Sequence, residues 1–214
     1  MGAHDTLSTN TTRERLIEAA GEAFAEHGFE GATVKDICLR AEANIAAVNY
    51  HFRDKNTLYL EVLRFAQKYA REKYPNPMPD SGLPAEVRLR EYVVKFMMRI
   101  LDTGRPAWHS KLMAREMVDP TAALDEVVKD TVSPNFTILS NIVRDLLGEK
   151  FNAEEIRLST SSVLSQCLFY FHCRNVIERL NPGFEYSEPN NRHIAAHIAD
   201  FSLAAIAKIR ADRN

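Results

Sequence analysis

Apolar residues recur at helical spacing along almost the whole chain, and this pattern limits the fold more than any other feature. After residue 11 they form a stripe at positions three and four apart, made of Leu16, Ile17, Ala20, Ala23 and Phe24. No run alternates apolar and polar residues as a half-buried strand does, and no Asn-Gly hairpin signal occurs. The sequence therefore predicts an all-α protein with about nine helices.

The composition indicates the class of protein and the cellular compartment. The 214 residues are 45% hydrophobic and 26% charged, with a formal net charge of −2, which is ordinary for a globular protein. No apolar run approaches the roughly 20 residues that span a bilayer, and the N-terminus does not resemble a signal peptide. Three cysteines without a CxxC pair indicate reduced thiols. We expect a cytoplasmic protein with a disordered arm over residues 1–10.

Capping and stop signals divide the first third of the chain into four helices. Thr11-x-x-Glu14 resembles a capping box, and Gly28 stops the helix that follows it. Thr33 and Asn44 are each placed to cap a further short helix. A fourth helix is expected over residues 54–73.

A proline-rich segment then interrupts the helices. The segment "PNPMPDSGLP", residues 75–84, holds four prolines and a glycine. We therefore expect a linker there, between one domain over residues 11–74 and a second over residues 85–214. In the second domain, Ser133-Pro134 predicts a kink, and Asn181-Pro182-Gly183 ends a long helix.

The second and third helices are short and joined by a tight turn at Glu42-Ala43. This is helix-turn-helix geometry, in which the second of the two helices enters the major groove of double-stranded DNA. Val48 and Phe52 are placed to face the small core. The predicted contacts to base edges are Ile45, Ala46, Ala47 and Asn49, and the predicted contacts to the DNA backbone are Thr33, Lys35, Tyr50, His51 and Lys55.

Residues 12–65 resemble the DNA-binding domain of TetR-family transcriptional regulators. The resemblance is carried by "GATVKDICLRAEANIAAVNYHFRDKNTLY" and above all by its ending HF-x-x-K-x-x-L. It implies a three-helix N-terminal domain with a connecting fourth helix, and a C-terminal helical domain that binds a small ligand and forms a homodimer. This chain has Glu42 where the family usually has glycine, and Asn49 where the family usually has tyrosine.

The charge of the N-terminal region is balanced rather than basic. Residues 1–74 contain ten Lys and Arg residues against eleven Asp and Glu residues. Lys35, Arg53 and Lys55 nevertheless flank the predicted reading surface. We therefore expect modest non-specific DNA affinity and a reliance on specific contacts.

The C-terminal half contains a candidate pocket for a small, largely apolar effector. The segment "CLFYFHCRN", residues 167–175, is the kind of aromatic helix that forms either ordinary core or the wall of an apolar pocket. Both readings stay open. The predicted ligand-binding residues are Trp108, Met113, Phe136, Leu168, Phe171 and His172.

The last helix carries a candidate dimer interface. A single helix-turn-helix offers too small an interface for strong specificity, so two copies are expected. The predicted interface residues are Ile194, Ile198, Phe201, Ala205 and Ile209, although such a stripe can also pack within its own chain. His193 and His197 have zinc-binding spacing, but no third ligand is near them in sequence, so we predict no metal.

These patterns favour a ligand-responsive DNA-binding regulator, in particular a repressor that a small molecule releases from a palindromic operator. No catalytic triad, paired-carboxylate site or glycine-rich phosphate loop has recognisable spacing, so we expect neither enzymatic activity nor a cofactor. The alternative is a helical ligand-binding or scaffolding protein that does not recognise DNA.

Overall fold

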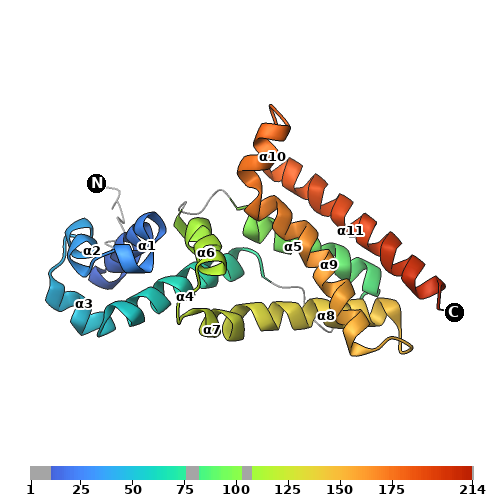
Figure 1. The fold of residues 1–214 in the computed structure, drawn as a ribbon, viewed down its shortest axis with the longest axis horizontal. Coiled ribbons are helices and arrows are strands. Elements are labelled where there is room, and N and C mark those ends of the chain that lie inside the picture. Colours follow the sequence, from blue (N-terminus) through green and yellow to red (C-terminus); the bar gives the residue numbers. More distant parts are fainter. Residues whose placement is uncertain (1–10, 76–81, 103–107, 214) are drawn as a thin grey trace, which may run out of the picture. The chain divides into compact units, whose positions relative to one another are not determined.

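The computed structural model describes residues 11–75, 82–102 and 108–213, and every regular element within them is helical (Figure 1). The predicted all-α class is confirmed. Among these residues no helix is both long and apolar enough to cross a membrane. The predicted arm over residues 1–10 and most of the proline-rich segment lie outside the described residues.

The helices form two compact units, and the chain passes between them within α4. The first unit comprises residues 1–67 and 106–127, and the second comprises residues 68–105 and 128–214. The helices of the first unit are α1 (Thr12–Gly31), α2 (Val34–Arg40), α3 (Ile45–Phe52), most of α4 (Lys55–Lys73), α6 (Trp108–Val118) and α7 (Leu124–Val127). Those of the second are α5 (Ala85–Ile100), the π-helical η1 (Val128–Val132), α8 (Ser133–Leu147), α9 (Ala153–His172), α10 (Arg174–Leu180) and α11 (Glu188–Ala211).

The units are not continuous along the chain, because α6, which follows residues 75–84, packs into the first unit. Trp108 and Leu112 are buried in the same core as α1 and α4. The Trp108 indole lies against Gly21, where an added Cβ would be only 2.5 Å from the ring. Its Nε1 donates to the Glu18 carboxylate at 2.9 Å. The missing side chain of Gly21 therefore lets α6 dock directly on α1.

The predicted N-terminal capping box is present at the start of α1. The Glu14 amide donates to Thr11 Oγ1 at 3.3 Å, and the Thr11 amide donates to Glu14 Oε2 at 2.8 Å. The predicted stop at Gly28 becomes a kink, since Gly28 has a φ of 73° and the helix then continues to Gly31. Phe29 folds back on α1 and α4, with its ring centroid 5.1 Å from that of Tyr59.

In the second unit, α5 packs against α8, α9 and α11 around a core that includes Leu89, Val93 and Leu139. Pro134 is the second residue of α8 and cannot donate to the turn before it, and that preceding turn is the π-helical η1, so the predicted irregularity falls just before the proline. The single long helix expected before Asn181 is two helices. Cys173, with φ of −96° and ψ of 19°, separates α9 from α10.

Candidate nucleic-acid interface

The helix α3 is held in the first unit by two buried side chains on one face. Val48 and Phe52 are 1% and 2% exposed, as the sequence predicts. The opposite face is open, with Tyr50 85% exposed, and Ile45 in the first turn of the helix is 53% exposed. A large aromatic side chain that is almost fully in solvent makes no contribution to the core, so this face is available to a partner.

Most residues predicted to contact DNA lie on this open side. On α3 the exposed ones are Ile45, Ala46, Asn49, Tyr50 and His51, while Ala47 is half-buried against the core. Thr33 and Lys35 are exposed at the start of α2, where the Thr33 hydroxyl caps the helix by accepting from the Asp36 amide at 3.1 Å. The first unit therefore brings the α3 face and the N-terminus of α2 together on one helix-turn-helix.

The turn before α3 has the hydrogen bonds of a Schellman motif. The Ala43 amide donates to the Cys38 carbonyl at 2.9 Å, and the Glu42 amide donates to the Leu39 carbonyl at 3.3 Å. Glu42 has a φ of 50°, which is the left-handed conformation that this motif requires at its end. Asn44 then caps α3 by accepting from the Ala47 amide at 2.8 Å. The glutamate in place of glycine thus leaves the turn geometry intact.

We expect the Glu42→Gly substitution to stabilise the first unit. A left-handed non-glycine residue costs roughly 1–2 kcal/mol, and the extra flexibility of an unfolded glycine offsets about 0.5–1 kcal/mol of this. The free energy of unfolding, measured by denaturant titration, should therefore rise by up to about 1 kcal/mol. The matched change Glu22→Gly, inside α1, should lower it by a similar amount. A loss of stability in Glu42→Gly would contradict this account of the turn.

The helix α3 ends in a strained turn that the sequence did not predict in detail. Arg53 has φ of 71° and ψ of −51°, and the Asp54 amide donates to the Phe52 carbonyl at 2.8 Å. Together these form a γ-turn. Asp54 then caps α4 by accepting from the Thr57 amide at 2.8 Å, and this hydrogen bond is the main reason that the pKa of the Asp54 carboxyl is below its ordinary value. The turn separates the exposed α3 sharply from α4.

The predicted phosphate contact Lys55 has partners within its own chain. Its Nζ donates to the Glu30 carbonyl at 3.4 Å and lies 4.6 Å from the centroid of the Phe29 ring. It therefore holds the start of α4 against the end of α1. Lys35 and Arg53 form no ion pair with any described residue, which leaves their charges available to phosphates.

The residues predicted to line an effector pocket are divided between the two units. Trp108 and Met113 pack on the core of the first unit. The others, Phe136, Leu168, Phe171 and His172, lie on α8 and α9 of the second unit. His172 is exposed, while the other three are half-buried. The sequence could not reveal this division because the contact of Trp108 with Gly21 joins residues far apart along the chain.

The residues of the predicted dimer stripe differ in exposure along α11. Ile194 and Ile198 are buried in the core of their own unit. Phe201 is 61% exposed, Ile209 is 43% exposed, and Ala205 is also exposed. His193 and His197 are exposed on the same helix, and no group of three His, Cys, Asp or Glu residues placed to hold a metal occurs in the described part of the chain.

Comparisons with known families match both parts of the chain. The family described as "Bacterial regulatory proteins, tetR family" matches residues 16–62, which include α2 and α3. The family described as "HTH-type transcriptional dual regulator CecR, C-terminal domain" matches residues 85–206.

Full-length relatives and solved structures agree with these matches. The chain is 27% identical to the transcriptional dual regulator CecR of Shigella flexneri, over 90% of this chain and 92% of that protein. It is 40% identical to the transcriptional repressor AcnR of Corynebacterium diphtheriae, over 68% of each chain. In fold it is similar to the regulator PfmR of Thermus thermophilus, with a TM-score of 0.64, 20% identity and coverage of 91% of this chain and 97% of PfmR.

Proposed function

Since the chain belongs to the TetR family of transcriptional regulators, we propose that it represses transcription from a palindromic operator and is released by a small, largely apolar molecule. Regulators of this family bind DNA and are not enzymes, so its activity is DNA binding rather than catalysis. A cytoplasmic location is part of the proposal, because the DNA is there. The name of AcnR, a repressor, supports repression, while CecR is named a dual regulator.

The observation that carries the proposal is the open face of α3. Ala46 is small and exposed, so the helix can approach base edges closely, and Asn49 is placed to pair with the N6 and N7 edge of adenine. Thr33 and Lys35 at the start of α2, together with Tyr50 and His51, are proposed to hold phosphates. Lys55 can contact a phosphate as well only if its Nζ gives up the hydrogen bond to the Glu30 carbonyl.

The proposed homodimer uses the exposed part of α11 and its neighbour α9. Phe201, Ala205 and Ile209 are exposed on α11, and Leu158 and Phe169 are half-exposed on α9. Large apolar side chains in solvent on two long helices are typical of a surface that a second copy covers. A two-fold dimer presents two α3 helices and requires an operator with two-fold symmetry.

We expect the Phe201→Arg substitution to break this dimer. An arginine without a partner would be buried in the interface, which costs about 3–5 kcal/mol, so the dimer dissociation constant should rise at least a hundredfold. Sedimentation equilibrium at micromolar concentration measures this. The control Val118→Arg, at an exposed apolar residue of α6 in the first unit, should leave the dimer unchanged. A wild-type monomer, or a Phe201→Arg protein that stays dimeric, would contradict the proposed interface.

The proposed effector site involves Phe136, Leu168, Phe171 and His172 of the second unit. A hundredfold release of operator requires about 2.7 kcal/mol of coupling between the two sites, and operator must then weaken effector binding by the same factor. Calorimetry with hydrophobic compounds, with and without operator, tests this reciprocity. Binders that are indifferent to operator would show that the site is not the switch.

The Phe171→Ala variant locates the effector site. It should lose the response to such a compound, because Phe171 supplies apolar surface to the proposed site. The matched control is Phe151→Ala, at a half-buried phenylalanine that packs on the same core. The two variants lose similar core contacts, so only a selective loss of response in Phe171→Ala supports the placement. An equal response in both would show that the site lies elsewhere.

A further inference from the structure

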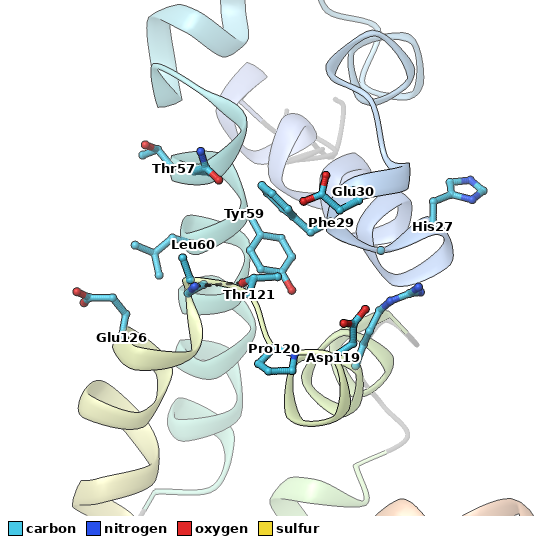
Figure 2. A pocket seen from close by; sticks show the side chains of 15 residues that line it. His27, Phe29, Glu30, Thr57, Tyr59, Leu60, Asp119, Pro120, Thr121 and Glu126 are labelled. Atoms are coloured by element: carbon cyan, nitrogen blue, oxygen red, sulfur yellow. Dashed lines mark hydrogen bonds between the residues drawn. The ribbon is translucent and has the colours of Figure 1, made fainter.

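The first unit contains a cavity of about 620 Å³ that no part of the proposed DNA-binding surface lines (Figure 2). The end of α1 contributes residues 27–30, the start of α4 contributes Asn56, Thr57, Tyr59 and Leu60, and the segment from α6 to α7 contributes Arg115, residues 119–123 and Glu126. We call it the α1–α4 cavity. Its volume is within the range of small-molecule sites in proteins, about 300–1,000 Å³.

The inner surface of the α1–α4 cavity is aromatic. Figure 2 shows the rings of Phe29 and Tyr59 next to one another, between α1 and α4. Their centroids are 5.1 Å apart and their planes are tilted by 62°. Leu60 and Pro120 add apolar surface beside them. An apolar or aromatic body would therefore lose water on the side that faces this wall when it bound here.

Buried hydrogen bonds hold this wall in place. Glu116 is completely buried and accepts from the Tyr59 hydroxyl at 2.6 Å. The same carboxylate accepts from the Thr121 amide at 2.9 Å and from the Thr121 hydroxyl at 3.0 Å. Burial, followed by the hydrogen bond to Glu116, raises the pKa of the Tyr59 phenol, so Tyr59 stays a donor. The turn that carries Thr121 is thus fastened to α4, and the cavity exists without a ligand.

The charges around the α1–α4 cavity favour a cation. Three carboxylates line it, those of Glu30, Asp119 and Glu126, against the guanidinium of Arg115 and the imidazole of His27. Glu126 forms an ion pair with Arg64 at 3.4 Å. The carboxylates of Glu30 and Asp119 form no hydrogen bond or ion pair with any other described residue. Two carboxylates without partners beside a concave apolar wall attract positively charged ligands.

We propose that the α1–α4 cavity binds a small organic ammonium compound with an aromatic body. The ring would lie against Phe29 and Tyr59, and the ammonium would reach the carboxylates of Glu30 and Asp119. An organic anion would meet the two unpaired carboxylates of Glu30 and Asp119 against the single guanidinium of Arg115, so the cavity should reject it. This site consists of other residues than the effector site proposed in the second unit, and the inference does not rest on the proposed DNA binding.

Two probes with the same ring and opposite charge test the proposal on the full-length protein. Isothermal calorimetry should detect binding of 2-phenylethylammonium at millimolar concentration, and no binding of 3-phenylpropanoate. Absence of ammonium binding up to about 10 mM, which corresponds to less than about 3 kcal/mol, would overturn the proposal. Equal binding of the two probes would also overturn it, because the carboxylates would then not select the ligand.

Matched variants then locate the site. The double substitution Glu30→Gln with Asp119→Asn should weaken ammonium binding about tenfold, since two charge-assisted contacts are lost. The control Glu22→Gln with Asp125→Asn makes the same change in net charge at exposed residues of this unit that do not line the cavity, and it should bind like wild type. Ala122→Trp should block binding by filling the cavity. Wild-type affinity in the Glu30/Asp119 variant, with an unchanged unfolding temperature, would show that the probe binds elsewhere.

Discussion

The Ala46→Glu substitution should reduce operator affinity at least a hundredfold, which corresponds to about 2.7 kcal/mol. Ala46 is exposed near the start of α3, on the face proposed to approach base edges. The small methyl group of Ala46 leaves room for the helix to approach the base edges, and a glutamate there would fill that room. It would also place a negative charge beside the phosphates of both strands. In a dimer both copies of α3 carry the substitution, so the loss of binding free energy occurs twice. Fluorescence anisotropy with labelled operator measures the effect.

The fold should not be altered by this change, because an acidic residue in the first turn of a helix is favourable. The matched control Ala153→Glu adds the same side chain at the first residue of α9, where it is also exposed. It should bind operator like wild type. If Ala46→Glu kept operator affinity within threefold of wild type, α3 would not be the reading helix.

The Trp108→Ala substitution should lower the free energy of unfolding by about 3–5 kcal/mol, as large-to-small changes of a buried tryptophan do. Trp108 is 4% exposed, and its ring is stacked on Phe65 with a centroid separation of 6.4 Å. Its loss would also leave the Glu18 carboxylate without the indole N–H. Denaturant titration followed by circular dichroism measures the change.

The control for Trp108→Ala lies on the same helix. Met117 is 41% exposed at the end of α6, so Met117→Ala should change stability by less than about 0.5 kcal/mol. A loss below about 1 kcal/mol in Trp108→Ala would show that α6 is not docked on α1 as the contact with Gly21 indicates.

Local signals account for the elements that the sequence predicts well. The capping box at Thr11 and Glu14 and the caps at Thr33 and Asn44 depend on residues within one turn of each other. Val48 is buried because its spacing puts it on the apolar face of α3. The open face of α3 follows from the same spacing, so much of the candidate DNA-binding surface can be placed from sequence alone.

Long-range packing accounts for what the sequence did not reveal. Gly21 appears in the sequence only as a glycine inside a helix, and its role depends on Trp108, which lies on a helix much later in the chain. The same contact places α6 in the first unit, although α6 follows the prolines in the chain. Ile198 and Phe201 belong to one helical stripe, yet only Phe201 is exposed, because the other helices of the unit cover only part of α11. The α1–α4 cavity likewise combines three segments that no sequence motif connects.

The chain is proposed to be a regulator that reads DNA through α3. The most direct measurement is a titration of labelled DNA from upstream of its own gene at about 150 mM salt, beside a shuffled sequence of equal length. We expect binding at least about a thousandfold tighter to the upstream DNA, at a site with two-fold symmetry. Equal affinity for the two DNAs, or binding to neither, would contradict it and would favour the helical ligand-binding protein without DNA recognition.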